Sequence, residues 1–358
     1  MSERSSSEIG VVVIARNEGD RLRRCLRSLS GERDRIVYVD SGSTDGSVEH
    51  ARSCGVDVVE LDSSEPFTMA RGRNAGLAHL AGSTDTLRFV QFVDGDCEVM
   101  PGWIETAAAF LRSHSDVAAV SGRRRERYPG HSAYNRLIDM EWDAPVGETA
   151  ACGGDAMIRA DALHQVGGYD TSMIAGEEPE LCCRLRLAGW RIWRVETPMT
   201  THDAALHSFG QWWRRTVRAG HAYAEGAWLH GRSSLRFNVR EVRSIVLFGA
   251  ALPLGSSSAL LVGWLLGSLG VMTFGALPLL AYPALWVRVY GGGLARGRSP
   301  GDAALYAAAC VGGKLPNAIG CVRFVRNRHR VRTLIEYKAS PRALSTTSRG
   351  SVDGGRCT

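Results

Sequence analysis

The chain has 358 residues, nine cysteines and a formal net charge of +6. Nine Lys or Arg residues and a single acid, Asp302, lie between positions 288 and 332, so this segment carries +8 and the rest is near −2 (6 − 8). This distribution excludes a general polyanion binder, and we expect no nucleic-acid partner. The cysteines are odd in number and lack Cys-x-x-Cys spacing, which predicts reduced, mostly buried thiols rather than a zinc site or disulfide scaffold.

Strand and helix patterns alternate from residue 9 to about residue 195. Short apolar runs predict strands at 10–15, 36–40, 56–61, 87–93, 117–120 and 191–195. Helical spacing predicts helices at 20–29, 47–54, 70–80, 103–112 and 180–188. This alternation predicts an α/β fold, with a mostly parallel sheet that has helices on both faces.

An uncharged apolar segment follows at residues 245–287, and its 43 positions fit two membrane helices of about twenty residues each. A turn near 267–270 would join them, and flanking arginines predict that both ends are cytoplasmic. A third apolar stretch, 303–325, leads into the arginine-rich segment 323–332 and is predicted to lie at the interface beside anionic lipid. The alternative is a buried helical pair in a soluble domain. Residues 1–8 lack the apolar core of a signal peptide, and the Ser/Gly-rich segment 340–358 is predicted to be disordered.

Two carboxylates, Asp94 and Asp96, follow the predicted strand 87–93 around a glycine. They therefore lie at the carboxyl end of a strand, where open α/β sheets bind ligands. Two oxygen donors at this spacing can hold Mg²⁺ or Mn²⁺, which also takes up phosphate oxygens. The alternative is a solvated turn.

Several segments in this order resemble the family-2 glycosyltransferases. They are 11–18 (VVVIARNE), 39–46 (VDSGSTDG), 70–76 (ARGRNAG), 93–96 (VDGD), 167–170 (GGYD) and 176–190, which begins GEEPE. The resemblance implies a GT-A domain over 9–235, followed by a membrane region over 236–335. It also implies an inner-membrane enzyme of cell-envelope polysaccharide synthesis. Such an enzyme would transfer a sugar, with inversion, from a nucleotide-diphosphate sugar to a lipid-linked or polysaccharide acceptor at the cytoplasmic face.

The resemblance also implies how the donor is bound. Asp40 would contact the nucleoside, together with backbone groups near Ala15 and Glu18. Family members usually have a second acid after Asp40, but this chain has Ser41, which leaves open the nucleobase that is recognised. Arg73 and Asn74 would lie near the diphosphate and sugar, as would Asp94. For Arg73, a solvated position on a helix face is the alternative.

The same resemblance implies the metal ligands and the base. Asp94 and Asp96 would hold Mn²⁺ or Mg²⁺, with Asp96 the direct ligand. His202 would be a further ligand, although a lone histidine is often structural. Glu178 would deprotonate the acceptor hydroxyl, with Glu177 as the alternative. A helix N-terminus would lower the pKa of this base, whereas a dry, acid-rich cleft would raise it, and the sequence does not decide between them.

The segment 211–215 (QWWRR) loosely resembles the Gln-x-x-Arg-Trp signature of membrane polysaccharide synthases, with arginine in place of the last tryptophan. The implied acceptor and diphosphate contacts are Gln211, Trp212, Arg214 and Arg215. Alternatively, the two tryptophans are anchors that face the membrane.

Two other classes of function deserve comparison. A sugar-nucleotide pyrophosphorylase-like nucleotidyltransferase would need a Gly-rich basic loop after the first strand, which residues 16–19 (RNEG) fit poorly. A non-catalytic binding subunit would not need the acids that are present. Because pore-forming processive synthases have more than two spans, the sequence favours addition of single sugars.

Overall fold

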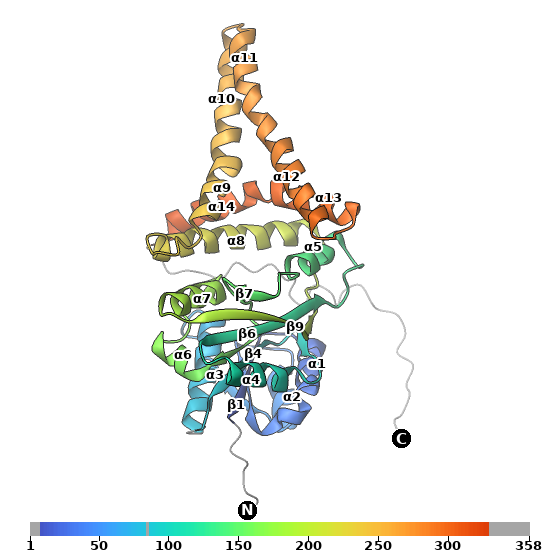
Figure 1. The fold of residues 1–358 in the computed structure, drawn as a ribbon, viewed down its shortest axis with the longest axis vertical. Coiled ribbons are helices and arrows are strands. Elements are labelled where there is room, and N and C mark those ends of the chain that lie inside the picture. The colour runs from blue at the N-terminus through green and yellow to red at the C-terminus, as the bar shows by residue number, and fades with distance from the viewer. Residues whose placement is uncertain (1–7, 84–85, 329–358) are drawn as a thin grey trace, which may run out of the picture.

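A computed structural model describes residues 8–83 and 86–328. The predicted disordered segments lie outside these residues, except for Glu8, and so do Arg330 and Arg332 of the arginine-rich segment. The described residues form an α/β part, a layer of helices above it and a projecting helical hairpin (Figure 1).

Within the described residues, nine strands form one sheet in the order β3-β2-β1-β4-β8-β6-β9-β5, with β7 paired to β9. The strands are β1 (Ile9–Ala15), β2 (Ile36–Asp40), β3 (Asp57–Glu60), β4 (Phe89–Asp94), β5 (Cys97–Val99), β6 (Val117–Glu126), β7 (Gly147–Thr149), β8 (Ala156–Arg159) and β9 (Arg191–His202). The first four are parallel, as are β6 and β9, but β8 runs antiparallel to both β4 and β6. The predicted α/β class is confirmed, but the sheet is mixed because β8 runs antiparallel to its neighbours and β5 and β7 run antiparallel to β9. These strands of three or four residues are too short to predict from the sequence.

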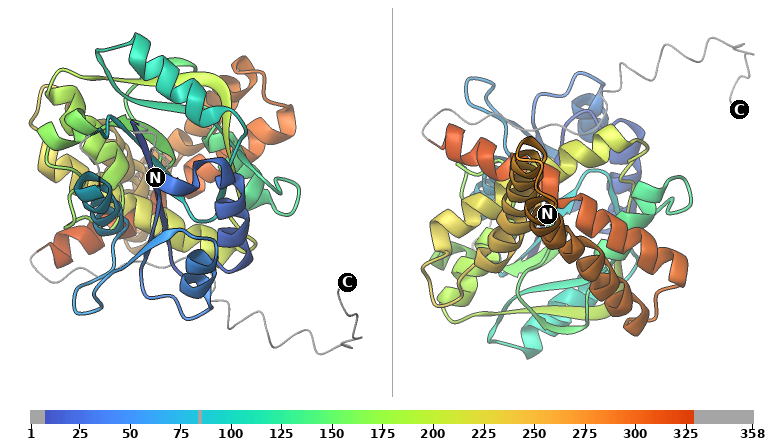
Figure 2. Two further views of the ribbon diagram at one scale, coloured as in Figure 1. Left: turned by 90° about the horizontal axis from the view of Figure 1, so that it is seen from below. Right: turned by 90° about the horizontal axis from the view of Figure 1, so that it is seen from above.

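Helices cover both faces of this sheet. They are α1 (Asp20–Ser28), α2 (Ser47–Ser53), α3 (Met69–Ser83), α4 (Trp103–Ser113), α5 (Ala133–Glu141), α6 (Ala160–Gln165) and α7 (Glu177–Leu187). Successive residues of β1 enter different cores because side chains alternate along a strand. Val11 and Val13 pack in one apolar cluster, and Val12 and Ile14 pack in another. The left view in Figure 2, which is seen from below, shows helices on both sides of the strands.

The C-terminal part is helical. Its helices are α8 (Phe209–His230), α9 (Val239–Val246), α10 (Leu252–Leu265), α11 (Leu269–Ala276), α12 (Ala281–Ala295), α13 (Pro300–Gly312) and α14 (Lys314–Asn327). Among the described residues, two continuous helices, Val239–Leu265 and Leu269–Ala295, are long and apolar enough to cross a membrane. Only 17% and 6% of their most apolar windows are buried, so the alternative of a buried helical pair is wrong.

We call α8, α13 and α14 the platform, because they lie between the α/β part and the hairpin (Figure 1). The predicted single helix 303–325 is two helices, and the pair Gly312-Gly313 at their junction disfavours a continuous helix. From above, α8 and α14 cross beneath the hairpin (Figure 2). They meet at glycines, since a Cβ on Gly220 would lie 2.1 Å from the carbonyl oxygen of Asn317, closer than any side chain allows.

Candidate functional site

The carboxyl ends of three parallel strands meet at one edge of the sheet. Ala15 of β1 pairs with Asp40 of β2, and Ile14 of β1 pairs with Asp94 of β4. Because parallel strands end on the same side, polar groups from distant parts of the chain converge here. The predicted donor-binding residues Ala15, Asp40 and Asp94 are therefore close together.

Asp40 builds the loop that follows it. Its Oδ2 atom accepts hydrogen bonds from the backbone amides of Gly42 and Ser43 at 2.8 and 2.7 Å, and its Oδ1 accepts one from the hydroxyl of Tyr38 at 2.5 Å. Burial and the neighbouring Asp40 raise the pKa of Tyr38, so this hydroxyl remains a donor. The Asp40 side chain is 2% exposed, and its contact with a nucleoside stays a prediction.

The loops after β1 and β2 are joined into one surface. The Asn17 side-chain oxygen accepts from the Thr44 amide at 2.7 Å, and the Gly19 amide donates to Asp45 at 2.8 Å. The amide of Ser41 donates to the carbonyl of Ala15, while the carboxylate of Glu18 pairs with Arg21 at 2.6 Å. These contacts fix the backbone that the sequence assigns to nucleoside binding, although the assignment itself stays a prediction.

Arg73 is the centre of the charged network. Its guanidinium lies 3.0 Å from Asp94 Oδ1, 3.0 Å from Glu177 Oε1 and 2.9 Å from Glu178 Oε1. Its side chain is fully buried, so the alternative of a solvated arginine is wrong. Arg73 therefore ties α3 to the end of β4 and to the first turn of α7. The adjacent Asn74 bonds the backbone amide and carbonyl of Tyr169, at 2.9 and 2.8 Å, which fixes the loop before α7.

A second arginine, Arg124, was missed by the sequence reasoning. Its Nη2 atom lies 3.4 Å from Asp94, and its Nε atom lies 3.5 Å from Asp155. Asp155 is buried and accepts hydrogen bonds from the Asp94 amide and from the hydroxyl of Thr200. Burial alone would raise the pKa of Asp94, but the charges of Arg73 and Arg124 outweigh it and hold this pKa below its usual value. Arg124 lies in the basic run 123–125 of β6, and Asp155 directly precedes the short apolar run of β8.

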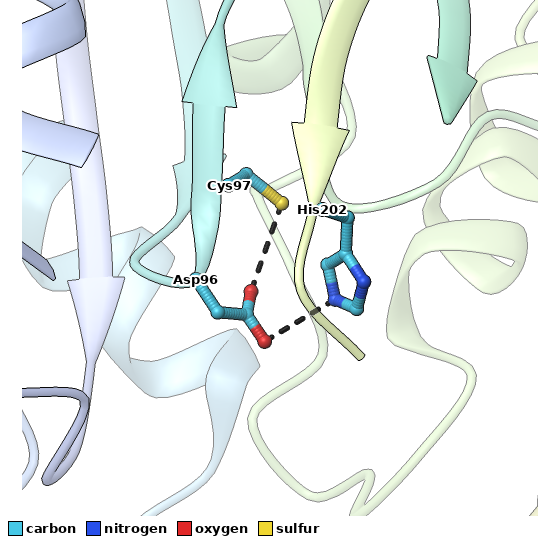
Figure 3. Close-up of side chains that lie close together, drawn as sticks. All are labelled: Asp96, Cys97 and His202. Carbon is cyan, nitrogen blue, oxygen red and sulfur yellow. Dashed lines mark hydrogen bonds and ion pairs between the residues drawn. The ribbon is translucent and has the colours of Figure 1, made fainter. Parts of the chain in front are cut away.

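The predicted metal ligands Asp96 and His202 lie together (Figure 3). His202 Nε2 is 3.2 Å from Asp96 Oδ2, and His202 Nδ1 lies 3.7 Å from Glu126, which can orient the ring. Cys97 also lies within reach, 3.6 Å from Asp96. Burial raises the pKa of the Cys97 thiol well above its usual value, and Mn²⁺ and Mg²⁺ prefer oxygen ligands to sulfur.

Asp96 and His202 therefore offer an oxygen and a nitrogen, a donor set that fits a divalent ion such as Mn²⁺ and leaves positions for phosphate oxygens. Asp94, the third predicted ligand, pairs with the two arginines and also lies with Cys97 and Asp155 in a second group that could hold a metal ion, so its role as a ligand stays a prediction.

The first turn of α7 carries the two candidate bases. Glu177 is 1% exposed, whereas the side chain of Glu178 is 16% exposed. Burial and the negative charge of Glu177 raise the pKa of Glu178 to about 7, against the opposing effect of Arg73. Burial and negative charge in the cleft thus raise the pKa of Glu178 more than the helix N-terminus lowers it, a balance that the sequence could not decide. A carboxylate with this pKa and with access to solvent can accept a proton near neutral pH.

The predicted acceptor segment is mainly structural. Gln211 accepts hydrogen bonds from the amides of His207 and Ser208 and completes the capping box of α8. Trp212 is 9% exposed and packs in a cluster with Leu137, so it is no membrane-facing anchor. Arg215 pairs with Glu141 at 2.8 Å, and Arg214 is exposed. Acceptor contacts from these residues stay predictions.

Comparison with known proteins shows which family part of the chain resembles. Residues 10–166 match the family described as glycosyl transferase family 2, and α7 lies beyond this match. The solved mannosyltransferase PcManGT from Pyrobaculum calidifontis, in complex with GDP-Man and Mn²⁺, shares the fold at a TM-score of 0.56. It is 19% identical, and the alignment covers 90% of this chain and 88% of that one.

Curated relatives match just over half of the chain. A pre-mycofactocin glycosyltransferase of Mycobacterium tuberculosis is 32% identical over 215 residues, or 56% of this chain and 43% of that protein. The succinoglycan biosynthesis protein ExoA of Rhizobium meliloti is 28% identical over 207 residues, or 54% of this chain and 62% of that protein. The chain thus spans roughly half the length of these relatives. Residues 10–166, which carry most of the sequence motifs, thus resemble the family-2 glycosyltransferases, and the chain shares the GT-A-like architecture of PcManGT.

Proposed function

We propose that this chain is an inverting glycosyltransferase that moves a sugar from a nucleotide-diphosphate sugar to a lipid-linked or polysaccharide acceptor at the cytoplasmic face of a membrane. The observation that carries the proposal is the buried guanidinium of Arg73, which joins Asp94 at the donor edge of the sheet to the candidate base Glu178. The groups proposed for donor binding and for deprotonation of the acceptor thus both contact the Arg73 guanidinium. The names of the curated relatives support glycosyl transfer.

The donor would lie along the carboxyl edge of the sheet. The joined loops after β1 and β2 would take the nucleoside, and the diphosphate would lie beside Asp96 and His202. These two residues would hold Mn²⁺ or Mg²⁺, which when bound supplies positive charge to the departing diphosphate. Arg73 and Arg124 keep Asp94 ionised beside this site. The Mn²⁺ named with PcManGT supports the choice of metal.

Glu178 would act on the acceptor. Its carboxylate takes the proton of an acceptor hydroxyl while that oxygen forms a bond to the anomeric carbon and the bond from this carbon to the diphosphate breaks. One displacement inverts the anomeric centre. Glu178 suits this role better than Glu177, because its side chain is the more exposed and its pKa lies near 7.

The hairpin supports attachment to a membrane. Large apolar side chains on it face solvent, including Leu254 at 68% exposed and Phe274 at 74%. Exposed apolar surface of this extent needs a cover, and helices of 27 residues are long enough to span a bilayer. The arginines that flank the hairpin would keep both of its ends in the cytoplasm, beside the nucleotide-sugar pool.

Reporter fusions test this topology. A reporter placed within residues 267–270 is expected to behave as external, and one placed after Lys338 as cytoplasmic, because the hairpin crosses twice. A fusion after Arg232, before the hairpin, is the cytoplasmic control. An external signal after Lys338 would mean that part of 303–325 also spans the bilayer, and the interfacial position of α13 and α14 would be wrong.

A panel of donors tests the activity itself. The full chain in membrane vesicles is incubated with different nucleotide-diphosphate sugars, and we expect one donor to release its nucleoside diphosphate in the presence of Mn²⁺. Formation of a nucleotide sugar from a nucleoside triphosphate and a sugar phosphate would identify a nucleotidyltransferase instead. Donor binding without release from any donor, with acceptor lipids present, would point to a binding subunit.

A further inference from the structure

The platform helix α8 contacts the helix that carries the base at two separate positions. Near the middle of α8, Ala222 packs on Gly176, the residue immediately before α7; a Cβ on Gly176 would lie 2.9 Å from the Cβ of Ala222. Gly176 also has φ +79°, a conformation that favours glycine. At the C-terminal end of α8, His230 contacts Glu180 of α7. In Figure 1, α7 lies beneath this end of α8.

The second contact is a buried, fully partnered carboxylate. Glu180 is 1% exposed, and Arg184 binds both of its oxygens at 2.7 Å. His230 Nε2 lies 2.7 Å from Glu180 Oε1. Arg184 also donates to the carbonyl of Val166 at 2.6 Å. A buried carboxylate that loses one partner is strongly destabilised, so the contact specifies the place of α7 against α8.

The other end of α8 is tied to the candidate metal site. The helix begins at Phe209, seven residues after His202, and its capping box and the buried Trp212 fix this end. One helix of 22 residues, about 33 Å long, therefore connects the strand that carries His202 with the helix that carries Glu178. Its opposite side packs on α14 of the platform.

We propose that Glu180 and His230 are a positioning pair through which α8 fixes the catalytic base. The inference rests on the proposed function, because it gives Glu178 the role of base. Glu178 lies two residues before Glu180 in the first turns of the same helix, so a shift of α7 moves both. Neither Glu180 nor His230 touches the carboxylates of the Arg73 network in the described structure, and the pair acts only through the position of α7.

Steady-state kinetics of the full chain in membrane vesicles test the pair. His230→Ala is expected to lower kcat for sugar transfer by about tenfold to a hundredfold, because small displacements of a reacting group have effects of this size. The KM for the donor should stay unchanged, since the donor loops lie on other elements. His230→Gln keeps an N–H that can reach Glu180 and should restore most of kcat. His164→Ala, at an exposed histidine of α6, is the matched control and should behave as wild type.

Glu180→Gln supplies a second variant. Combined with His230→Ala, it should lower kcat no further than the more severe single change, because both remove the same contact. Wild-type kcat in His230→Ala, additive effects in the double variant, or failure of glutamine to restore kcat would overturn the pair. The pair would also be overturned if His230→Ala raised the KM for the donor by the same factor by which it lowered kcat. Absence of transfer in the wild type under every donor would instead overturn the proposed function.

Discussion

Replacing Glu178 by glutamine is expected to lower the rate of sugar transfer by roughly 10²- to 10⁴-fold, the usual contribution of a general base. Glutamine keeps the size of the side chain but cannot accept the proton. Donor binding should survive, because the nucleotide loops after β1 and β2 do not include α7. The measurement is the turnover number for transfer, together with the dissociation constant of the intact donor from calorimetry.

The pH dependence of the same reaction gives an independent check. The base must be ionised to act, and the pKa of Glu178 is raised to about 7 by burial and by Glu177. The wild-type rate should therefore rise with pH through about 7 and level off above it, whereas the residual rate of Glu178→Gln should lack this rise. Glu177→Gln is the matched control. If it abolishes transfer and Glu178→Gln does not, the base is the neighbouring residue.

Removal of the metal is expected to lower the rate of sugar transfer by at least as much as Glu178→Gln does. Transfer should cease in EDTA and return with Mn²⁺ or Mg²⁺, because a departing diphosphate needs its charge neutralised. Asp96→Asn should lower turnover by roughly 10²-fold or more, since it removes the carboxylate charge that lies 3.2 Å from His202 Nε2. Circular dichroism and the thermal midpoint should show that the variant remains folded.

Cys97→Ala is the control for the metal site. Cys97 lies within the same cluster, but Mn²⁺ and Mg²⁺ prefer oxygen ligands to thiols, so its loss should leave metal-dependent activity in place. A loss of metal response in Cys97→Ala would make the sulfur a ligand and favour a softer ion than Mn²⁺. Full activity of the wild type in chelator would remove the metal role from Asp96 and His202.

The amino-acid sequence by itself determined the elements whose signals are local. Apolar runs ending in turn residues placed β1, β2 and β4, and the acids directly after them had to lie at one edge once the strands were parallel. The uncharged segment 245–287 likewise determined a helical hairpin, because its length and composition need no knowledge of neighbours. Short strands such as β8 carry too few residues for such a signal.

Only the tertiary structure decided which contacts the polar side chains make and how these contacts shift their pKa values. The sequence left Arg73 as either a donor-site residue or a solvated helix residue, but three carboxylates from two other elements surround its guanidinium. Gln211 resembles part of an acceptor motif, yet its side chain is used to cap α8. The pKa of Glu178 likewise follows from burial and from Glu177 and Arg73 together. Desolvation and charge–charge interactions depend on which distant segments pack together, and local sequence patterns do not contain that information.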